Sequence, residues 1–422
     1  MLKLIAESSA ELLDFIEGLD TPLSAPQKRH VLQIADALIT TEGRKDLSNL
    51  YRHIVGDPCP KSAADTFREA PWQSEDIRES LRAHLVKTAF ELADAEGVPK
   101  RVFLSVDDSL TVKDKHSHKL ECVDWHFDHT RSTMNKPAFT KGMVYVVLRL
   151  TVGNISVTID VQLYLREKTI RHLNRSRQQG EKLQFRTKLE IAREMLEAIT
   201  PLLPEDYQVY VLFDSWYASA KFIKWCRKQD WHIICQLKSN RNLDGVAVKL
   251  HNQRLKHQQY ARVGVPAADK TDDRHYLVRS VSGKLNGLPG TVRVFISKRH
   301  PEDRRPRYFL CTDLSLSAEQ ALTFYHHRWA CEVTNWYIAE RLGWADSRLW
   351  RFESTYKFMT VLWLALAFLE CQKARDQQYG NLADVIRAHR RKHAHKLVEE
   401  ACALVLKLGD VAPVLARFTV AA

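Results

Sequence analysis

The feature that most constrains the fold is a series of short apolar runs that begins about a quarter of the way along the chain. The first run, RVFLSV at 101–106, ends in Asp107 and Asp108. Two further β-rich runs lie at 143–150 and 155–165, and the Val-Gly-Asn between them is typical of a hairpin turn. This order predicts three antiparallel strands.

The next segment alternates between helical and strand-like patterns. A helix is expected at 187–203, where apolar residues recur three or four positions apart. A near-continuous apolar strand at 207–213 ends in Asp214, and after a short helix another run at 232–237 predicts a further strand. Three antiparallel strands followed by strand–helix–strand units are typical of a ribonuclease H-like α/β fold, in which a mixed sheet presents carboxylates from neighbouring strands.

Other patterns flank and interrupt this layout. Residues 1–97 are expected to be helical, with Ser24 and Ser74 at helix starts and Gly97 at a helix end. Residues 239–312 are polar and basic, and their short runs between Gly and Pro predict a β-rich insertion. The chain is therefore expected to comprise a helical N-terminal domain at 1–97, a ribonuclease H-like core in two parts at 98–238 and 313–370, the insertion at 239–312 and a helical C-terminal tail at 371–422.

The charge of the chain is strongly positive. Lys and Arg outnumber Asp and Glu by 63 to 51, which gives a net charge of +12 and a pI near 9.2. A basic excess of this size favours a polyanionic partner, because Lys and Arg that neutralise phosphates release counterions. A basic enzyme without such a partner is the alternative. The helices of 1–97 carry many of these cations and are interpreted either as a DNA-gripping domain or as a packing domain.

The eight cysteines are scattered and include no Cys-x-x-Cys pair, which is typical of reduced thiols in the cytoplasm.

The longest apolar run, 358–369, is too short to span a bilayer and is interpreted as a buried helix, so no membrane partner is expected. One group of residues matches no common zinc spacing and is interpreted as a polar loop: Cys122, His126 and His129, with His116 and His118 upstream.

The acids that follow apolar runs need an explanation, because a carboxylate buried beside core strands is costly without a partner. A hard divalent cation supplies that partner, and several carboxylates can hold two such ions about 4 Å apart for phosphodiester chemistry. An isolated acid at such a position is otherwise a turn former.

A second candidate group lies in the strongly helical segment 317–342. Tyr325, Arg328 and Glu332 are spaced so that one helix would present them on one face. There the first two would hold a phosphate while the glutamate binds a metal ion. A surface salt bridge between Arg328 and Glu332 is the alternative.

Four segments together resemble the signature segments of DDE transposases of the insertion-sequence-four superfamily. They are VDDS at 106–109, VLFDSWY at 211–217, QLKSNRNL at 236–243 and Tyr-x-x-Arg-x-x-x-Glu at 325–332. The resemblance implies a ribonuclease H-like core in which Asp108, Asp214 and Glu332 hold two Mg²⁺ or Mn²⁺ ions. The first acid falls on Asp108 because a hydroxyl residue follows it, although strand alternation alone leaves Asp107 open.

The resemblance also implies a reaction and its partners. Such a transposase binds terminal inverted repeats in double-stranded DNA, hydrolyses phosphodiesters at the ends of the element and joins the freed 3′-hydroxyls to target DNA. It is expected to act as a homodimer on DNA, at the nucleoid of a bacterial cell. A ribonuclease H-like nuclease that only cuts and a non-catalytic DNA-binding protein derived from a transposase are the alternatives.

Further DNA contacts follow from the same resemblance. It assigns a base-stacking role to Tyr308 in the insertion, where an ordinary strand aromatic is the alternative. Lys238 and Arg241 follow a core strand and are expected to contact the DNA backbone, unless they are merely solvated. The Lys that the resemblance implies seven residues after the glutamate is Ala339 here, and Arg341 lies about 200° further round a helix.

Overall fold

The computed structural model describes residues 8–52, 60–117, 119–128, 131–133, 135–255, 259–265 and 274–418 of the chain. Ten of its strands form one sheet: β1 (Arg101–Val112), β2 (Asp124–Phe127), β3 (Phe139–Val152), β4 (Ile155–Tyr164), β5 (Gln208–Phe213), β6 (His232–Leu237), β9 (Ala261–Val265), β10 (Arg274–Gly283), β11 (Val292–Lys298) and β12 (Arg307–Cys311). The strand order is β2-β3-β1-β5-β6-β12-β11-β10-β9, and β4 pairs with β3 outside that path.

The sheet is mixed. β1 pairs antiparallel with β3, which pairs antiparallel with β4, whereas β1, β5 and β6 run parallel. The hairpin between β3 and β4 turns at Gly153, whose φ of 56° is a left-handed conformation that glycine adopts without strain. This arrangement confirms the predicted α/β class, a mixed sheet of the ribonuclease H-like kind with helices at both ends of the chain.

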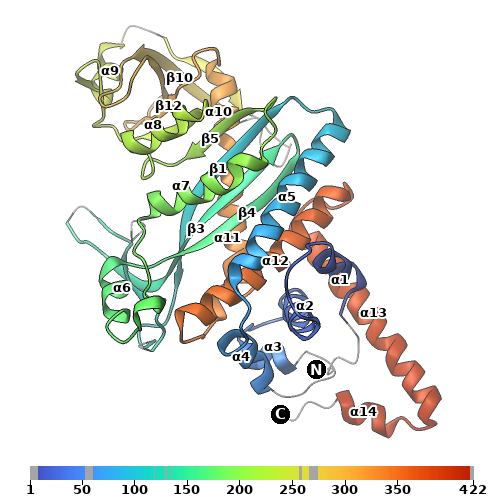
Figure 1. The fold of residues 1–422 in the computed structure, drawn as a ribbon. Coiled ribbons are helices and arrows are strands. Elements are labelled where there is room, and N and C mark those ends of the chain that lie inside the picture. The colour runs from blue at the N-terminus through green and yellow to red at the C-terminus, as the bar shows by residue number, and fades with distance from the viewer. Residues whose placement is uncertain are drawn as a thin grey trace.

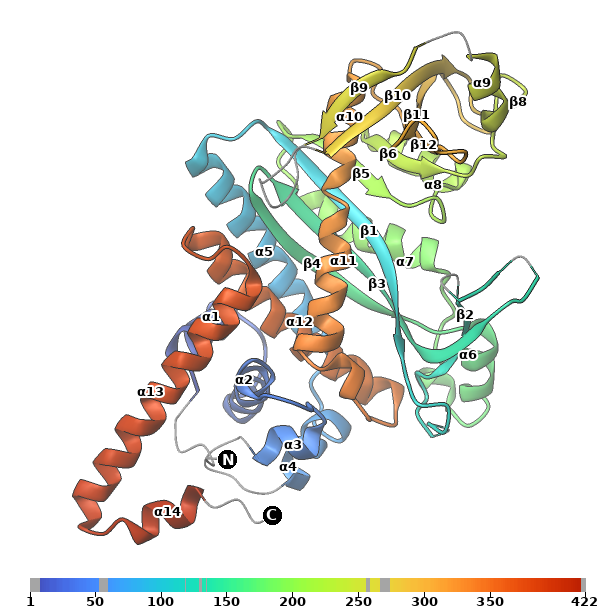
Figure 2. The same cartoon turned by 180° about the vertical axis from the view of Figure 1, so that it is seen from behind.

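The segment that interrupts the layout extends the same sheet. It contains the short ribbon of β7 (Asn242–Leu243) and β8 (Val246–Ala247), then α9 (Val248–Arg254) and β9 to β12. β12 pairs antiparallel with β6, with Leu310 opposite Cys235, so the insertion strands continue outward from the core. The strands of this segment and β6 stand at one end of the molecule in Figures 1 and 2.

Helices cover both faces of the sheet. They are α1 (Ala10–Glu17), α2 (Ala25–Thr40), α3 (Leu47–Arg52), α4 (Pro60–Arg68), α5 (Ser74–Glu96), α6 (Glu167–Leu173), α7 (Lys188–Ile199), α8 (Ala220–Lys228), α10 (Ala318–His326), α11 (Trp329–Trp336), α12 (Phe352–Arg375), α13 (Leu382–Leu408) and α14 (Ala412–Phe418). α5 and α7 lie on the face that is in front in Figure 1, and α11 crosses the opposite face, which is in front in Figure 2.

The N-terminal helices share a hydrophobic core with the sheet. The buried side chains of α1, α2 and α5 belong to the same cluster as those of β1, β3, β4 and α12. On α5, the guanidinium groups of Arg78 and Arg82 are buried and pair with Asp160 of β4. These two cations therefore hold α5 to the sheet and are not available to a polyanion.

The basic segment 387–396 of α13 also makes internal contacts. His389 lies 2.8 Å from a carboxylate oxygen of Asp36, and Arg390 donates to the carbonyls of Ile39 and Thr41 at the end of α2. Part of the positive charge of this helix thus joins it to the N-terminal helices.

The apolar run 358–369 is buried within α12, as predicted. Among the helices in the described residues, none combines the length and apolar character needed to cross a membrane.

Candidate active site

β1 does not end at Val106 as the apolar run predicts. It continues through Asp107 and Asp108 to Val112, because β3 supplies a backbone partner for the polar residues, with Asp107 opposite Val147. Pattern alone underestimates such a strand, since its two acids interrupt the apolar run while the antiparallel ladder continues. The two acids therefore lie within β1 and not after it.

The register of β1 and β5 brings Asp214 beside Asp107. Ser105 is the last residue of β1 that pairs with β5, and it lies opposite Leu212. Asp107 lies two residues beyond Ser105, and Asp214 lies two residues beyond Leu212, just after β5 ends, so the two acids lie at the same level of the sheet. Oδ1 of Asp214 also accepts hydrogen bonds from the backbone N–H groups of Trp216 and Tyr217, at 2.8 and 3.4 Å. Neighbouring strands lie about 4.8 Å apart, so two such carboxylates are close enough to repel each other.

Asp107 and Asp108 point to opposite faces, because successive side chains of a strand alternate. Asp107 Oδ2 accepts a hydrogen bond of 2.7 Å from Arg328 Nη1, on the face crossed by α11. Asp108 accepts hydrogen bonds from the Tyr217 hydroxyl at 3.0 Å and from Lys188 Nζ at 2.5 Å, on the face covered by α7. Asp107 thus shares a face with α11, and Asp108 does not.

Tyr325, Arg328 and Glu332 come together across a break between two helices. A turn at 327–328 separates α10 from α11, so the continuous helix predicted for 317–342 is wrong in that detail. The backbone of Arg328 stays right-handed helical, with φ −60° and ψ −29°, which preserves the spacing. Arg328 Nη2 donates to Glu332 Oε1 at 2.6 Å, and its guanidinium lies 5.7 Å from the centre of the Tyr325 ring.

The acids of this site suit a hard cation. Burial, opposed by the charge of Arg328 and reinforced by those of Asp108 and Asp214, raises the pKa of Asp107 to about 7. A divalent cation would relieve this repulsion, and the donor atoms are carboxylate oxygens, which Mg²⁺ and Mn²⁺ prefer. Within the described ranges, no three His, Cys, Asp or Glu side chains enclose a metal position, and Arg328 is the cation that lies between Asp107 and Glu332.

Two donors beside Glu332 have no hydrogen-bond partner in the part of the chain that is described. They are the buried Tyr325 hydroxyl and Nε of Arg328. Burial raises the pKa of Tyr325, so its hydroxyl stays protonated and can donate. A buried donor without an acceptor costs roughly 1–3 kcal/mol, and a phosphate oxygen beside Glu332 would accept from either one.

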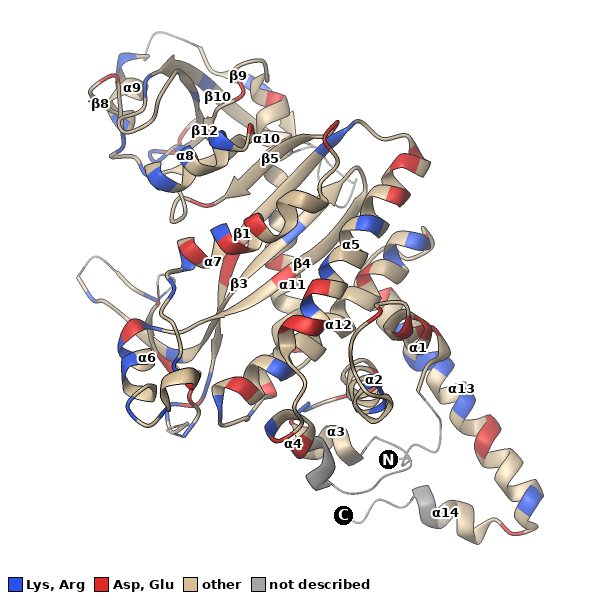
Figure 3. Ribbon diagram, viewed as in Figure 1, with Lys and Arg blue, Asp and Glu red and all other residues tan. Residues whose placement is uncertain are grey.

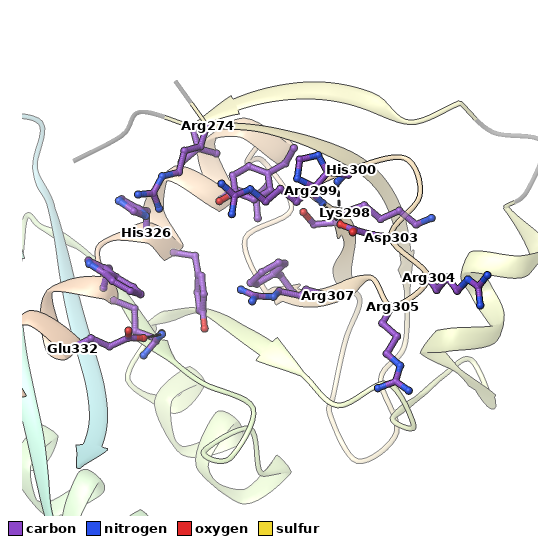
Figure 4. A pocket seen from close by; sticks show the side chains of 18 residues that line it. Arg274, Lys298, Arg299, His300, Asp303, Arg304, Arg305, Arg307, His326 and Glu332 are labelled. Atoms are coloured by element: carbon purple, nitrogen blue, oxygen red, sulfur yellow. Dashed lines mark hydrogen bonds and ion pairs between the residues drawn. The ribbon is translucent and has the colours of Figure 1, made fainter. Parts of the chain in front are cut away.

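These three residues lie at one end of a cleft of about 1060 Å³. One wall of the cleft is formed by β10, β11 and the loop between β11 and β12, and the other by α10 and the start of α11. Figure 4 shows Glu332 at one end of the cleft and Arg304 and Arg305 at the other. The site therefore opens into a larger concave surface.

The remaining predicted DNA contacts lie in different environments. Tyr308 is only 6% exposed and packs in the cluster opposite the cleft, whereas its neighbour Phe309 lines the cleft. Lys238 is exposed at the end of β6. Arg241 donates to the carbonyl of Ala218 at 2.8 Å, so it braces the loop that follows Asp214.

The group weighed as zinc ligands does not form such a site in the described residues. Cys122 is buried, and burial raises the pKa of its thiol to about 12. Burial lowers the pKa of His126 to about 4. His118 and His129 lie outside the described residues.

Some residues near the site belong to no recognisable sequence pattern. Lys188 begins α7, and its ammonium group lies 5.0 Å from the centre of the exposed Trp216 ring, two residues after Asp214. No local motif marks Lys188, whereas Trp216 and Tyr217 belong to the VLFDSWY segment. Ala339 lies in a π-helical segment, Tyr337–Arg341, and the guanidinium of Arg341 stacks over Trp336 at 4.6 Å.

Comparison with known families gives two overlapping matches. A family model described as DDE superfamily endonuclease matches residues 15–275, more than half of the chain. A second, described as Transposase DDE domain, matches residues 186–368. No curated protein matches the sequence. The first match includes Asp107, Asp108 and Asp214, and the second includes Asp214 and Glu332.

Proposed function

Because the chain belongs to the DDE superfamily of endonucleases, we propose that it is a transposase of the insertion-sequence-four type that cuts the ends of a DNA element and joins them to a target. The observation that best supports this function is the bridge by which Arg328 links Asp107 to Glu332, level with Asp214. The bridge supports a shared role for the acids of β1 and α11, next to two donor atoms that have no partner in the described residues.

The acids that bind metal are Asp107, Asp214 and Glu332 in this proposal. The resemblance by sequence favours Asp108 as the first of them, and the side-chain directions favour Asp107, which faces α11. Asp108 is already neutralised by Lys188 and held by Tyr217. We therefore give Asp108 a positioning role, in which it ties α7 and the loop after β5 to the middle of β1.

Two Mg²⁺ or Mn²⁺ ions held by the three acids would supply the activation of the attacking water or 3′-hydroxyl and the stabilisation of the leaving oxygen. The residues of this chain do the positioning. Tyr325 and Arg328 donate to non-bridging phosphate oxygens, which orients the phosphorus for in-line attack. Arg328 pairs with both Asp107 and Glu332 and so offsets their charge.

The two chemical steps need no reactants other than water and DNA. In the first, water adds to phosphorus and the 3′-oxygen leaves as a hydroxyl, so that the other strand end keeps a 5′-phosphate. In the second, that 3′-hydroxyl attacks a target phosphodiester and displaces another 3′-oxygen. Since each end must be cut and paired with the other, we expect a homodimer on DNA, with Lys238 and surface cations of the N-terminal helices available to the backbone.

A strand-transfer assay tests this function. Duplexes that carry the inverted repeats flanking the reading frame are supplied with pre-cleaved, labelled 3′ ends, together with supercoiled target DNA and Mg²⁺. The proposal predicts labelled target molecules with wild-type protein and none with Glu332→Gln. A protein that cuts uncleaved ends but joins none would be a nuclease, and one that binds the ends without cutting would be a non-catalytic DNA-binding protein.

A further inference from the structure

A buried ion pair lies beneath α11, on the face of the sheet to which Asp107 points. β3 and β4 together carry three charged residues, Lys141, Arg149 and Asp160, whereas the blue and red segments of Figure 3 gather mainly on the helices and loops. Arg149 lies opposite Ser105 of β1, two positions before Asp107. Cross-strand neighbours and alternate residues of a strand share a face, so Arg149 and Asp107 point to the same side of the sheet.

The ion pair joins Arg149 to Glu370 of α12. Nη1 of Arg149 donates to Oε1 of Glu370 at 2.5 Å, and the two side chains are 6% and 2% exposed. A buried pair is weak evidence for stability by itself, because the loss of hydration offsets much of the attraction between the charges. The hydrogen bonds that the pair makes to its surroundings are therefore the better guide to its role.

The acid of the pair binds an irregular point in β4. The pairing of β3 with β4 shifts between Leu148 and Arg149, so that Ile159 is the extra residue of a β-bulge in β4. Oε2 of Glu370 accepts a hydrogen bond from the backbone N–H of Thr158 at 2.6 Å, and Oε1 accepts one from its hydroxyl at 3.0 Å. Glu370 thus fixes α12 to the bulge.

The arginine of the pair holds the side of α11 that faces the sheet. Nη1 of Arg149 also donates to Oγ1 of Thr334, which is 2% exposed. Thr334 lies two positions after Glu332, about 200° round the helix, so the two side chains leave α11 on opposite sides. Cys331, directly before Glu332, is buried over β1, and its Sγ lies 3.6 Å from the carbonyl oxygen of Ser105. Contacts with two neighbouring strands therefore flank Glu332.

We propose that Arg149 is a positioning residue for metal binding, because its bond to Thr334 sets the rotation of α11 about its axis and so the direction of Glu332. The inference rests on the proposed function for the role of Glu332 as a metal ligand. A carboxylate about 6 Å from a helix axis moves about 1.5 Å when the helix turns by about 15°. Metal–oxygen distances tolerate only about 0.2 Å, so a rotation that leaves the fold intact would still weaken the metal site.

Metal binding in the absence of DNA tests the inference apart from catalysis. Full-length protein is titrated with Mn²⁺, and the free ion is followed by its electron paramagnetic resonance signal. Thr334→Val keeps the shape of the side chain but cannot accept from Arg149, so the affinity for Mn²⁺ should fall about tenfold. Thr334→Ser restores an acceptor and should bind within about twofold of wild type. An unchanged affinity of Thr334→Val would overturn the proposal.

Ser156→Ala is the matched control. It removes the hydrogen bond of 2.8 Å that Nη2 of Arg149 donates to Ser156 of β4, and it removes no contact of α11. Urea unfolding should show similar losses of stability for Ser156→Ala and Thr334→Val, since each loses one hydrogen bond to the same guanidinium. The Mn²⁺ affinity of Ser156→Ala should nevertheless match that of wild type. An equal loss of affinity in both variants would show that Arg149 supports the sheet and does not direct Glu332.

The metal dependence of cleavage provides a second readout. Because a high metal concentration favours the rotation of α11 that binds the ion, Thr334→Val should need about tenfold more Mg²⁺ for half-maximal cleavage of a labelled element end. At saturating Mg²⁺ its rate should come within about threefold of wild type. A lower saturated rate with an unchanged half-saturating concentration would reject the positioning role.

Glu332→Gln distinguishes failure of this inference from failure of the proposed function. If Glu332→Gln binds Mn²⁺ as tightly as wild type, Glu332 is not a metal ligand and the proposed function is contradicted. If Glu332→Gln weakens Mn²⁺ binding while Thr334→Val does not, the proposed function stands and the positioning role of Arg149 is rejected.

Discussion

Oδ2 of Asp107 lies 2.7 Å from Nη1 of Arg328, although 221 positions separate the two residues along the chain. The contact joins the middle of the first core strand to the turn before α11. It depends on three local features: the extended β1, the side-chain alternation that turns Asp107 to this face, and the right-handed backbone at Arg328. The Asp107–Arg328 pair therefore forms only when β1 and α11 are correctly packed against each other.

Replacement of Arg328 should damage cutting more than folding. Arg328→Gln removes the charged donors that hold the phosphate, so the cleavage rate should fall by about 100-fold. Arg328→Lys keeps the charge but loses the bidentate geometry and should give an intermediate rate. Cleavage of a labelled element end under single-turnover conditions measures both, and an Arg328→Gln rate within threefold of wild type would exclude a role in phosphate binding.

Tyr217 should matter for stability and little for chemistry. Its hydroxyl donates to Asp108 on the face away from α11, so Tyr217→Phe removes one hydrogen bond and leaves the ring packing in place. The free energy of unfolding should fall by about 1 kcal/mol in urea titrations. A complete loss of cleavage by the folded variant would show instead that Asp108 acts at the reacting phosphate.

The buried cluster at Asp160 should be essential for folding. Asp160→Ala would leave Arg78 and Arg82 buried without their acid, which typically costs about 3–5 kcal/mol. Thermal unfolding measures the effect, with Glu91→Ala as the control, because Glu91 pairs with Lys87 on the exposed side of α5. Similar melting temperatures for the two variants would show that the ion pairs of Asp160 do not stabilise the fold.

The stability of the protein should fall in mild acid partly because of His327. Burial, together with the charge of His326, lowers the pKa of His327 from 6.5 to about 4, and its ring stacks on Phe103 at 4.4 Å. In the unfolded chain His327 binds a proton below about pH 6.5, whereas in the folded chain it does so only below about pH 4. The free energy of unfolding therefore decreases as the pH falls from 6.5 to 4. Urea unfolding between pH 7 and pH 4.5 should give a flatter pH dependence for His327→Phe than for wild type; parallel curves would refute this assignment.

The strands of the core could be predicted because each buried strand corresponds to a short apolar run in the sequence. The runs at 143–150, 155–165, 207–213 and 232–237 all became strands within a few residues of the expected bounds. β1 was underestimated because Asp107 and Asp108 interrupt its apolar run, and only the partner strand shows that the ladder continues. The continuity of the insertion with the core sheet was likewise invisible, since the pairing of β12 with β6 joins segments some 70 residues apart.

The site was predicted less completely than the fold. Local spacing marks Tyr325, Arg328 and Glu332, and Arg328 contacts both of the others. Asp214 follows β5, where the apolar run ends. The side to which each acid of β1 points depends on which helix covers which face, and no local pattern contains that information. The basic runs were misleading for a similar reason, because Arg78 and Arg390 make internal contacts that composition does not distinguish from DNA contacts.

The assignment of the first acid is the central claim, and cleavage by two variants made side by side tests it most directly. Asp107→Asn and Asp108→Asn are compared on a labelled element end in Mg²⁺, after unfolding curves establish that both are folded. We predict a loss of at least about 1000-fold for Asp107→Asn and a rate within about tenfold of wild type for Asp108→Asn. Full activity of Asp107→Asn with an inactive Asp108→Asn would contradict this assignment. It would indicate that Asp108, on the other face of β1, is the first metal ligand.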